Sequence, residues 1–325
     1  MSEQSVHVVF GAGQIGHPLA RLLCDRGHRV RLVRRTGSGP DGVELVRGDA
    51  GDPAFATEAS RDATAIYHCI NPTYDSGVWA RELPRFMNSL LAAAGRSGAR
   101  LVVLDNLYML GNPGGRVIDE DSPIAPCSRK GEIRARIDAL MMSAHARGDA
   151  RVVVGRASDF YGPGGTQSYF GDAFWPSALK DGSALVLTSM AELHTFHYTL
   201  DVAAGLATLG TAPDDATGRW WILPAAPAES SRAMIDRLGA SLGRTLKTRA
   251  MPKLVLSLLK PFVKILGELG EMSYQWEGPF VTSDRRFRER FHPQVTYSTP
   301  ALPRPWRGHA STTRSAARRR WAPPS

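Results

Sequence analysis

The chain has 325 residues, 43% of them hydrophobic, and a formal net charge of +9. That length is sufficient for a large core in one or two domains, and no apolar run approaches the ~20 residues of a membrane-spanning helix. Residues 296–325 hold six arginines and no acidic residue, so the rest of the chain is nearly balanced in charge and is not typical of a specific nucleic-acid-binding protein.

The first predicted elements are a buried strand, Val6–Phe10, a glycine turn and an amphipathic helix. Gly11, Gly13 and Gly16 have the spacing G-x-G-x-x-G, in which the glycines permit a tight turn, close approach of a pyrophosphate and close packing of helix on strand. The strand–turn–helix context is the one that a dinucleotide site requires. A plain strand–turn–helix is the alternative interpretation.

The start of the following helix offers unpaired N–H groups and a positive dipole end to phosphates. We therefore expect Gln14 and Ile15, which lie in the turn, to contact the cofactor together with the three glycines.

The second predicted strand, residues 28–33, ends at Arg34 and Arg35, with no acidic residue before Asp41. An acidic residue there would bind the ribose hydroxyl of NAD, whereas two guanidinium groups suit the 2′-phosphate of NADP. NADP is therefore favoured over NAD. The alternative is a pair of solvated surface arginines.

Residues 43–46 and 65–70 are the third and fourth predicted strands. Asp49, after the third strand, is placed to accept from the adenine amine, and Asp52 before a proline is typical of a helix N-cap. Asn71 follows the fourth strand, near the expected nicotinamide.

Further strands and helices alternate along the chain, which favours an α/β fold. We expect strands at 101–104, 151–154 and 220–224, helices at 79–95, 128–147 and 231–242, and a strand running into a helix at 194–202, with Ser128 and Asp201 as N-caps.

Five motifs follow one another in the order typical of one enzyme family. They are the glycine turn, Gly48-Asp49, the turn that ends at Gly111, and the segments 156–163 and 194–203. With these motifs the chain resembles the extended short-chain dehydrogenase/reductase superfamily, of the NAD(P)-dependent epimerase/dehydratase type. The resemblance implies a doubly wound parallel sheet, the NAD(P)-binding Rossmann fold, over residues 1–165 and about 194–210. It also implies a smaller substrate-binding region over residues 166–297.

The sequence departs from that family at the residues that carry its chemistry. Phe10 replaces the first glycine of the usual T-G-x-x-G-x-x-G, Asn106 replaces the catalytic Ser or Thr, and Pro126 replaces the Tyr of Tyr-x-x-x-Lys. Asn106 can still donate a hydrogen bond to a substrate oxygen but cannot pass on a proton. Lys130 keeps its position, either as a ligand of the nicotinamide ribose or as a surface lysine.

Two phenols remain near the expected site. Tyr108 lies on the same turn as Asn106, and Tyr161 lies in a loop expected to line the substrate cavity, so both are candidate proton donors. A buried aromatic role is the alternative for Tyr108. Asp159 is placed either to bind polar groups of a substrate or to cap the local turn.

The C-terminal third contains two less regular segments. Residues 254–269 are rich in Leu, Val and Ile and are interrupted by Pro261, which predicts a helix pair in a lid or an oligomer contact, with membrane-surface docking as the alternative. Residues 298–325 have no apolar periodicity, and we interpret them as a disordered basic tail.

Together these features predict an NADP-dependent oxidoreductase or epimerase-like enzyme for a small hydroxyl- or carbonyl-bearing substrate. The alternative is a non-catalytic NADP-binding sensor or regulatory protein. Cys24, Cys69 and Cys127 lack the spacing of metal ligands or of a disulfide framework, and the first residues predict a strand rather than a signal peptide. We therefore expect no metal site and a cytoplasmic location. The sequence leaves open whether two copies pair through the helices that flank the sheet.

Overall fold

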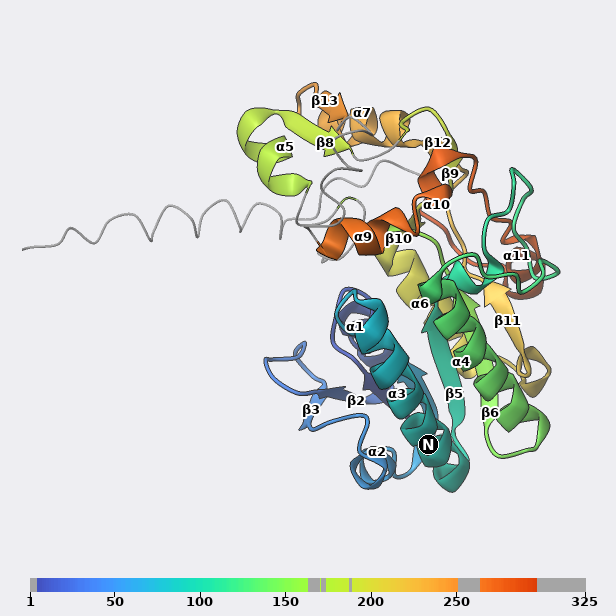
Figure 1. Cartoon of the computed structure of the whole chain (residues 1–325). Coiled ribbons are helices and arrows are strands. Elements are labelled where there is room, and N and C mark those ends of the chain that lie inside the picture. The colour runs from blue at the N-terminus through green and yellow to red at the C-terminus, as the bar shows by residue number, and fades with distance from the viewer. Residues whose placement is uncertain (1–4, 163–169, 171–173, 187–188, 251–263, 297–325) are drawn as a thin grey trace, which may run out of the picture.

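The computed structural model describes residues 5–162, 170, 174–186, 189–250 and 264–296. Its centre is a seven-stranded, wholly parallel sheet (Figure 1). The strands are β1 (Val6–Phe10), β2 (Arg29–Arg34), β3 (Glu44–Arg47), β4 (Ala63–His68), β5 (Arg100–Asp105), β6 (Arg151–Arg156) and β11 (Arg219–Ile222). Their order is β11-β6-β5-β4-β1-β2-β3, so the predicted doubly wound α/β fold is confirmed.

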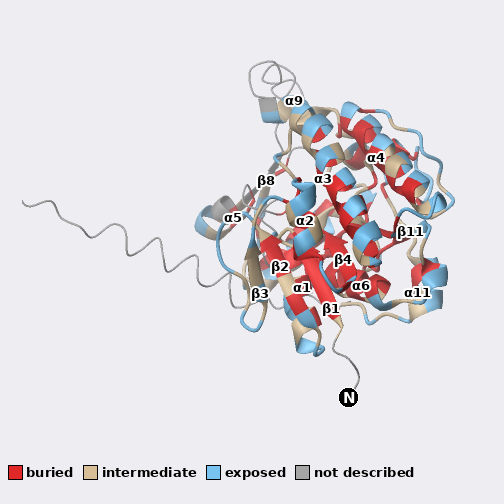
Figure 2. Ribbon diagram, turned by 90° about the horizontal axis from the view of Figure 1, so that it is seen from below, coloured by how far each residue is buried: buried red, intermediate tan, exposed pale blue. Residues whose placement is uncertain are grey.

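Helices cover both faces of this sheet. They are α1 (Gly16–Asp25), α2 (Pro53–Ala59), α3 (Ser76–Ser97), α4 (Arg129–Ala146) and α6 (Thr199–Thr211). Apolar residues of α3 and α4 share one hydrophobic cluster with Val8 and Val103 of the sheet, and those of α1 and α6 share a second with Val9 and Val102. Figure 2 shows the buried strands between these helices. Because both faces are covered, the central strands are continuous apolar runs.

The smaller region lies beyond the carboxyl ends of the sheet strands (Figure 1). Its elements are β7 (Phe160–Tyr161), α5 (Trp175–Asp181), β8 (Ser183–Val186), β9 (Leu193–His194), β10 (His197–Tyr198), β12 (Glu229–Ser230), α7 (Ser231–Ser241), β13 (Lys247–Ala250), α9 (Lys264–Gly270), α10 (Tyr274–Glu277) and α11 (Arg285–Phe291). A separate core of aromatic and aliphatic side chains holds α5, α7 and β10 together. After β10 the chain returns to the sheet for α6 and β11, and it then re-enters the smaller region at β12.

Local capping signals explain several helix starts. The Asp52 carboxylate accepts from the N–H groups of Ala54 and Phe55, and Ser128 Oγ accepts from Gly131 N at 3.0 Å, as predicted. The expected N-cap role of Asp201 is wrong, because Asp201 is the third residue of α6. Its carboxylate instead accepts from the backbone N and the Oγ1 of Thr296, both at 2.8 Å, and so holds a distant segment.

Some expectations fall where the structure gives no description. Residues 254–263 of the predicted helix pair and the basic tail 298–325 lie outside the described residues. Within the described ranges, no helix is both long and apolar enough to cross a lipid bilayer.

Candidate cofactor and active site

The glycine turn joins β1 to α1 at the carboxyl edge of the sheet. Gly11 has φ +102°, and a Cβ there would lie 2.8 Å from the backbone of Cys69 on the neighbouring strand connection. A Cβ at Gly16 would lie 1.7 Å from the carbonyl oxygen of Gly11, so helix and turn are in backbone contact. Gly13 is exposed, and a Cβ there would meet no atom of the described residues within 4 Å. The turn is thus tightly packed at Gly11 and Gly16 and open at Gly13, where a pyrophosphate would approach the backbone.

Unsatisfied polar groups surround this turn. The N-cap residue of α1, Ile15, has no side-chain acceptor for the first N–H groups of the helix. Gln14 Oε1 and Arg34 Nε are buried atoms with no hydrogen-bond partner among the described residues. Buried groups of this kind are usually paired, so a ligand that meets them here is compatible with the structure.

The two arginines after β2 have different surroundings. Arg34 is half-buried, and it donates to the carbonyl oxygen of Ser38 and lies against Gly37. Burial and the nearby Arg34 charge lower the pKa of His17, at the start of α1, so the arginine lies close to the glycine turn. Arg35 is exposed and forms no ion pair within the described part of the chain.

Asp49 and Asn71, two residues expected at the cofactor, are engaged by arginines of the flanking helices. Arg85 of α3 contacts both carboxylate oxygens of Asp49, at 2.8 and 3.3 Å, and this contact lowers the pKa of that carboxyl. Arg134 of α4 donates to Asn71 Oδ1 at 3.1 Å and to Asp105 Oδ1 at 2.9 Å. Neither arginine stands out in the sequence, although Arg134 lies one helical turn after Lys130 on the same face of α4.

Asn106 follows β5 directly and is half-buried. Its Oδ1 accepts from the backbone N–H of Tyr108 at 3.0 Å, which closes an Asx turn. Because the oxygen is used in this way, the Nδ2 amino group is left to donate elsewhere. This Nδ2 group is the donor that we predict from the sequence to hydrogen-bond a substrate oxygen.

Lys130 is fully buried, so the interpretation as a surface lysine is wrong. Its ammonium contacts the carboxylate of Glu268 and lies 2.7 Å from Glu271 Oε1 and 3.0 Å from the carbonyl oxygen of Glu268. Glu268 also accepts from the N–H and the hydroxyl of Ser76, both at 3.1 Å. Two carboxylates, Glu268 in α9 and Glu271 directly after it, therefore compensate the positive charge of Lys130.

Tyr108 packs among aromatic side chains that the sequence did not connect with it. Its ring stacks on Trp79 at 6.0 Å between centroids, and its hydroxyl lies 3.4 Å from that of Tyr74. The Lys130 ammonium lies 4.5 Å from the Tyr74 ring centroid, on the ring face. Burial raises the pKa of Tyr108 to about 12 and that of Tyr74 well above its usual range, so both phenols stay protonated at neutral pH.

Asp159 lies in the loop after β6, close to both phenols, and contributes to the raised pKa of each. Its Oδ2 accepts from Trp276 Nε1 and lies 3.1 Å from His194 Nε2. His194 Nδ1 lies 3.1 Å from the carbonyl oxygen of Gln275, to which it donates. Within the described residues, His194 Nε2 makes no hydrogen bond, although it lies within ion-pair distance of Asp159.

The structure does not bring Tyr161 into this group. Tyr161 is 2% exposed and packs against Tyr198 in the core of the smaller region, with Arg237 over its ring. His197 is buried near β11, where its ring hydrogen-bonds Ser158 and the carbonyl oxygen of Leu223. Within the residues that the structure describes, no three His, Cys, Asp or Glu side chains converge as metal ligands.

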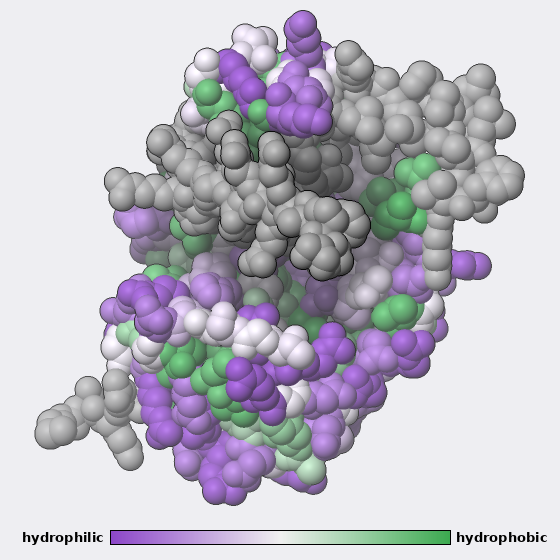
Figure 3. All heavy atoms as spheres, turned by 90° about the vertical axis from the view of Figure 1, so that its left-hand side faces the viewer, coloured by the Kyte–Doolittle hydropathy of each residue, from purple (hydrophilic) through white to green (hydrophobic). Residues whose placement is uncertain are grey.

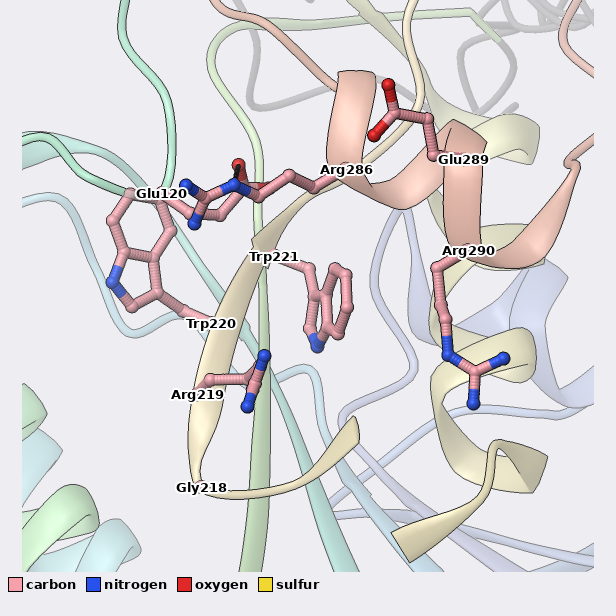
Figure 4. A pocket seen from close by; sticks show the side chains of 8 residues that line it. All are labelled: Glu120, Gly218, Arg219, Trp220, Trp221, Arg286, Glu289 and Arg290. Carbon is pink, nitrogen blue, oxygen red and sulfur yellow. Dashed lines mark ion pairs between the residues drawn. The ribbon is translucent and has the colours of Figure 1, made fainter. Parts of the chain in front are cut away.

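A pocket of about 540 Å³ lies elsewhere, between the edge strand β11 and α11 (Figure 4). Several of its charged groups are paired: Glu120 accepts from Ile222 N at 2.9 Å, and Arg286 and Arg290 pair with Asp121 and Asp215. The face in Figure 3 instead shows a hollow between the sheet and the smaller region, with hydrophobic residues exposed in it.

Comparison with known proteins agrees with this geometry. A sequence model of the NAD dependent epimerase/dehydratase family matches residues 7–222. A 3-diazoavenalumate denitrifying reductase from Streptomyces is 27% identical over 267 residues, which cover 77% of this chain and 86% of that protein.

Two solved structures have the same fold. A UDP-glucose 4-epimerase superposes with a TM-score of 0.74 at 14% identity, covering 95% of this chain and 98% of that one. A dTDP-glucose 4,6-dehydratase from Streptomyces venezuelae, determined with NAD bound, superposes with a TM-score of 0.73 at 18% identity, covering 93% and 98%. The family match spans the glycine turn, the sheet and the carboxyl-edge residues described above, and on this ground the chain belongs to the NAD-dependent epimerase/dehydratase family.

Proposed function

We propose that the chain is an NADP-dependent reductase of a small-molecule substrate, which binds above the carboxyl ends of β1, β4, β5 and β6. The residues present suit the cofactor: Gly13 opens to solvent, Gln14 Oε1 and Arg34 Nε have no hydrogen-bond partner among the described residues, and the exposed Arg35 can meet a phosphate. When bound, the reduced nicotinamide supplies a hydride. NAD in place of NADP is the outcome expected if Arg35 is only a solvated side chain.

The single observation that carries the reductive direction is the pairing of Lys130. Oxidation of an alcohol needs a group that removes a proton, which in this family is a phenol whose pKa a free lysine lowers. Here Lys130 is held between Glu268 and Glu271, and burial raises the pKa of the nearby phenols Tyr74 and Tyr108 instead of lowering it. Little phenolate is then available as a base, whereas a phenol can still donate a proton.

The substrate that suits this site best needs no proton from a side chain at all. The Streptomyces relative is named as a denitrifying reductase of a diazo compound. In such a reduction an aryl diazonium ion takes up one hydride, which becomes the new C–H bond, while the C–N bond breaks and N₂ leaves. This reaction transfers no proton, so it does not need the hydroxyl groups that Asn106 and Pro126 replace. We therefore propose an aryl diazo compound as substrate.

A carbonyl compound is the second candidate. The Nδ2 group of Asn106 can polarise a carbonyl oxygen, and the protonated Tyr108 on the same turn can donate the proton that the new alkoxide needs.

The test follows deuterium from NADPH that is labelled at C4 of the nicotinamide. The full-length protein is incubated with labelled NADPH or NADH and either 4-carboxybenzenediazonium or benzaldehyde, and products are analysed by mass spectrometry, with heat-denatured protein as control. Deuterated benzoic acid formed faster than in the control supports the diazo substrate, and deuterated benzyl alcohol supports the carbonyl substrate. If neither product carries label while calorimetry shows NADP binding, the reductase proposal fails and a non-catalytic NADP-binding protein takes its place.

The proposal also includes a cytoplasmic location, supported by three cysteines that are all free. We leave open whether two copies pair through the helices that flank the sheet; neither α3 nor α4 has an exposed large hydrophobic side chain among the described residues. Sedimentation velocity measures the assembly state directly.

A further inference from the structure

The pocket between β11 and α11 (Figure 4) lies apart from the candidate cofactor site. In the sheet order, β6, β5 and β4 stand between β11 and β1, which leads into the glycine turn. At about 4.8 Å per strand, β11 and β1 are roughly 19 Å apart. The pocket volume of about 540 Å³ falls within the range of roughly 300–1,000 Å³ that is typical of small-molecule sites.

Arg219 brings to this pocket a positive charge that no acidic side chain meets among the described residues. It is exposed, and its guanidinium Cζ lies 5.9 Å from the centroid of the Trp221 ring. Trp221 Nε1 donates to the carbonyl oxygen of Ala216 at 3.0 Å, which fixes the indole. Figure 4 shows this indole between Arg219 and Arg290. A cation–π contact leaves the N–H groups of a guanidinium available to an acceptor in the pocket.

Two further arginines reach the pocket from α11 and keep some capacity to donate hydrogen bonds. Arg290 Nη2 lies 3.1 Å from both carboxylate oxygens of Asp215, and Arg286 Nη2 donates to Asp121. Both aspartates are at the surface, with Asp121 70% and Asp215 68% exposed. Neither Nη1 group makes a hydrogen bond within the described residues, so each arginine can also donate to a ligand.

The acidic residues of the lining lie at the other end of the pocket. Figure 4 shows Glu120 and Glu289 beside Arg286. Glu120 Oε1 accepts from Ile222 N at 2.9 Å, and burial raises the pKa of this carboxyl. The end at Trp221 is therefore lined by arginine and indole, which are the groups that attract an anion and an aromatic ring.

We infer that this pocket binds an aromatic carboxylate, with Arg219 and Arg290 as donors to the carboxylate and Trp221 as the wall beside the ring. Guanidinium groups suit a carboxylate because their paired N–H donors match its two oxygens. The inference goes beyond the proposed reductase function: it adds a second ligand site, and filling that site requires neither NADP nor hydride transfer.

Two probes of nearly equal shape test the charge preference directly. The probes are trans-cinnamate, which is anionic at neutral pH, and trans-cinnamamide, which is neutral. Binding of each to the full-length protein is measured by titration calorimetry, without NADP and with saturating NADP. We expect cinnamate to bind at least fivefold more tightly than cinnamamide in both conditions, because the two sites are separate.

The variant Arg219→Gln removes the charge and keeps a donor. Because Arg219 is exposed and makes no hydrogen bond within the described residues, the variant should fold normally. It should bring the two affinities within about twofold of each other. Arg136→Gln is the matched control, because it removes an arginine that is 74% exposed on α4, and the fivefold preference should persist.

Equal binding of the two probes by the wild-type protein overturns the inference, as does failure of both probes to bind. An unchanged preference in Arg219→Gln also overturns it. Loss of cinnamate binding when NADP is present would place the anion in the cofactor site and would overturn it as well. The deuterium experiment has no bearing on these results, so failure of the reductase proposal and failure of this inference are separate outcomes.

Discussion

Lys130 and Glu268 are 138 positions apart in the sequence, yet the Lys130 ammonium contacts both the carboxylate and the backbone carbonyl oxygen of Glu268. Lys130 stands on α4 beside the sheet, and Glu268 stands on α9 of the C-terminal segment. The contact joins the sheet domain to the C-terminal segment beside the candidate site. It also accounts for a fully buried lysine, since a buried ammonium ion needs an anionic partner.

We expect Lys130→Met to lower the free energy of unfolding by roughly 3–5 kcal/mol, because it leaves two carboxylates facing each other without a cation. Urea unfolding followed by tryptophan fluorescence measures the change. Adding Glu268→Gln and Glu271→Gln to Lys130→Met should recover part of the loss, since the remaining groups are then neutral. An unchanged midpoint in the single variant would show that the buried ion pairs contribute nothing.

The glycine turn predicts opposite effects for two neighbouring substitutions. Gly13→Ala adds a Cβ to open space, so the unfolding free energy should change by less than about 0.5 kcal/mol while the NADP affinity falls at least tenfold. Gly16→Ala places its Cβ 1.7 Å from the Gly11 carbonyl oxygen and should destabilise the fold itself. Thermal unfolding and NADP calorimetry on both variants distinguish cofactor contact at Gly13 from helix packing at Gly16. Normal NADP binding by Gly13→Ala would contradict a pyrophosphate site at the glycine turn.

The choice of cofactor is expected to depend on Arg35. Arg35→Ala should weaken NADP binding about tenfold, which is about 1.4 kcal/mol, and leave NAD binding unchanged, because only NADP carries the 2′-phosphate. Arg136→Ala, on the exposed face of α4, is the control and should alter neither affinity. Equal losses for both cofactors in Arg35→Ala would refute a phosphate contact.

Buried histidines should make stability fall in mild acid. Burial lowers the pKa of His197 to about 4, that of His7 to about 4 and that of His68 to about 3. The unfolded chain binds protons on these rings near pH 6.5 and the folded chain does not, so stability is full above pH 6.5. It falls between pH 6.5 and about 4, by up to ~1.4 kcal/mol per pH unit for each ring.

Unfolding free energies between pH 7 and 4.5 check this slope. His197→Asn, which can still pair with Ser158 and Leu223, should reduce the slope, and His292→Asn, at an exposed position, should not. A slope that is the same in wild type and His197→Asn would contradict the assignment.

Local sequence signals were sufficient where one segment determines its own structure. The apolar run Val6–Phe10 followed by glycines predicted β1 and the turn, and Asp52 before Pro53 predicted the start of α2. The strand predicted at residues 65–70 is observed two residues earlier, at Ala63–His68, because pairing with β1 and β5 sets its register.

The active site could be predicted only in outline. The resemblance identified Asn106 and Lys130, but no local pattern connects Lys130 with Glu268, or Asp49 with Arg85, since these contacts exist only after distant helices have packed. Tyr74 was missed for a similar reason: it is one aromatic residue in an irregular loop, and only the fold places it beside Tyr108. The roles assigned to the site residues stay predictions until cofactor binding is measured.

The return of the chain to form β11 affects synthesis on the ribosome. The outer edge of β6 has no neighbour until residues 157–218 have emerged, and at about 5–20 residues per second this takes several seconds. During that interval a hydrophobic strand with free N–H and C=O groups is open to other nascent chains. Slow elongation or crowded polysomes should therefore favour misassembly at this edge, and a chaperone that binds extended apolar segments would act there first.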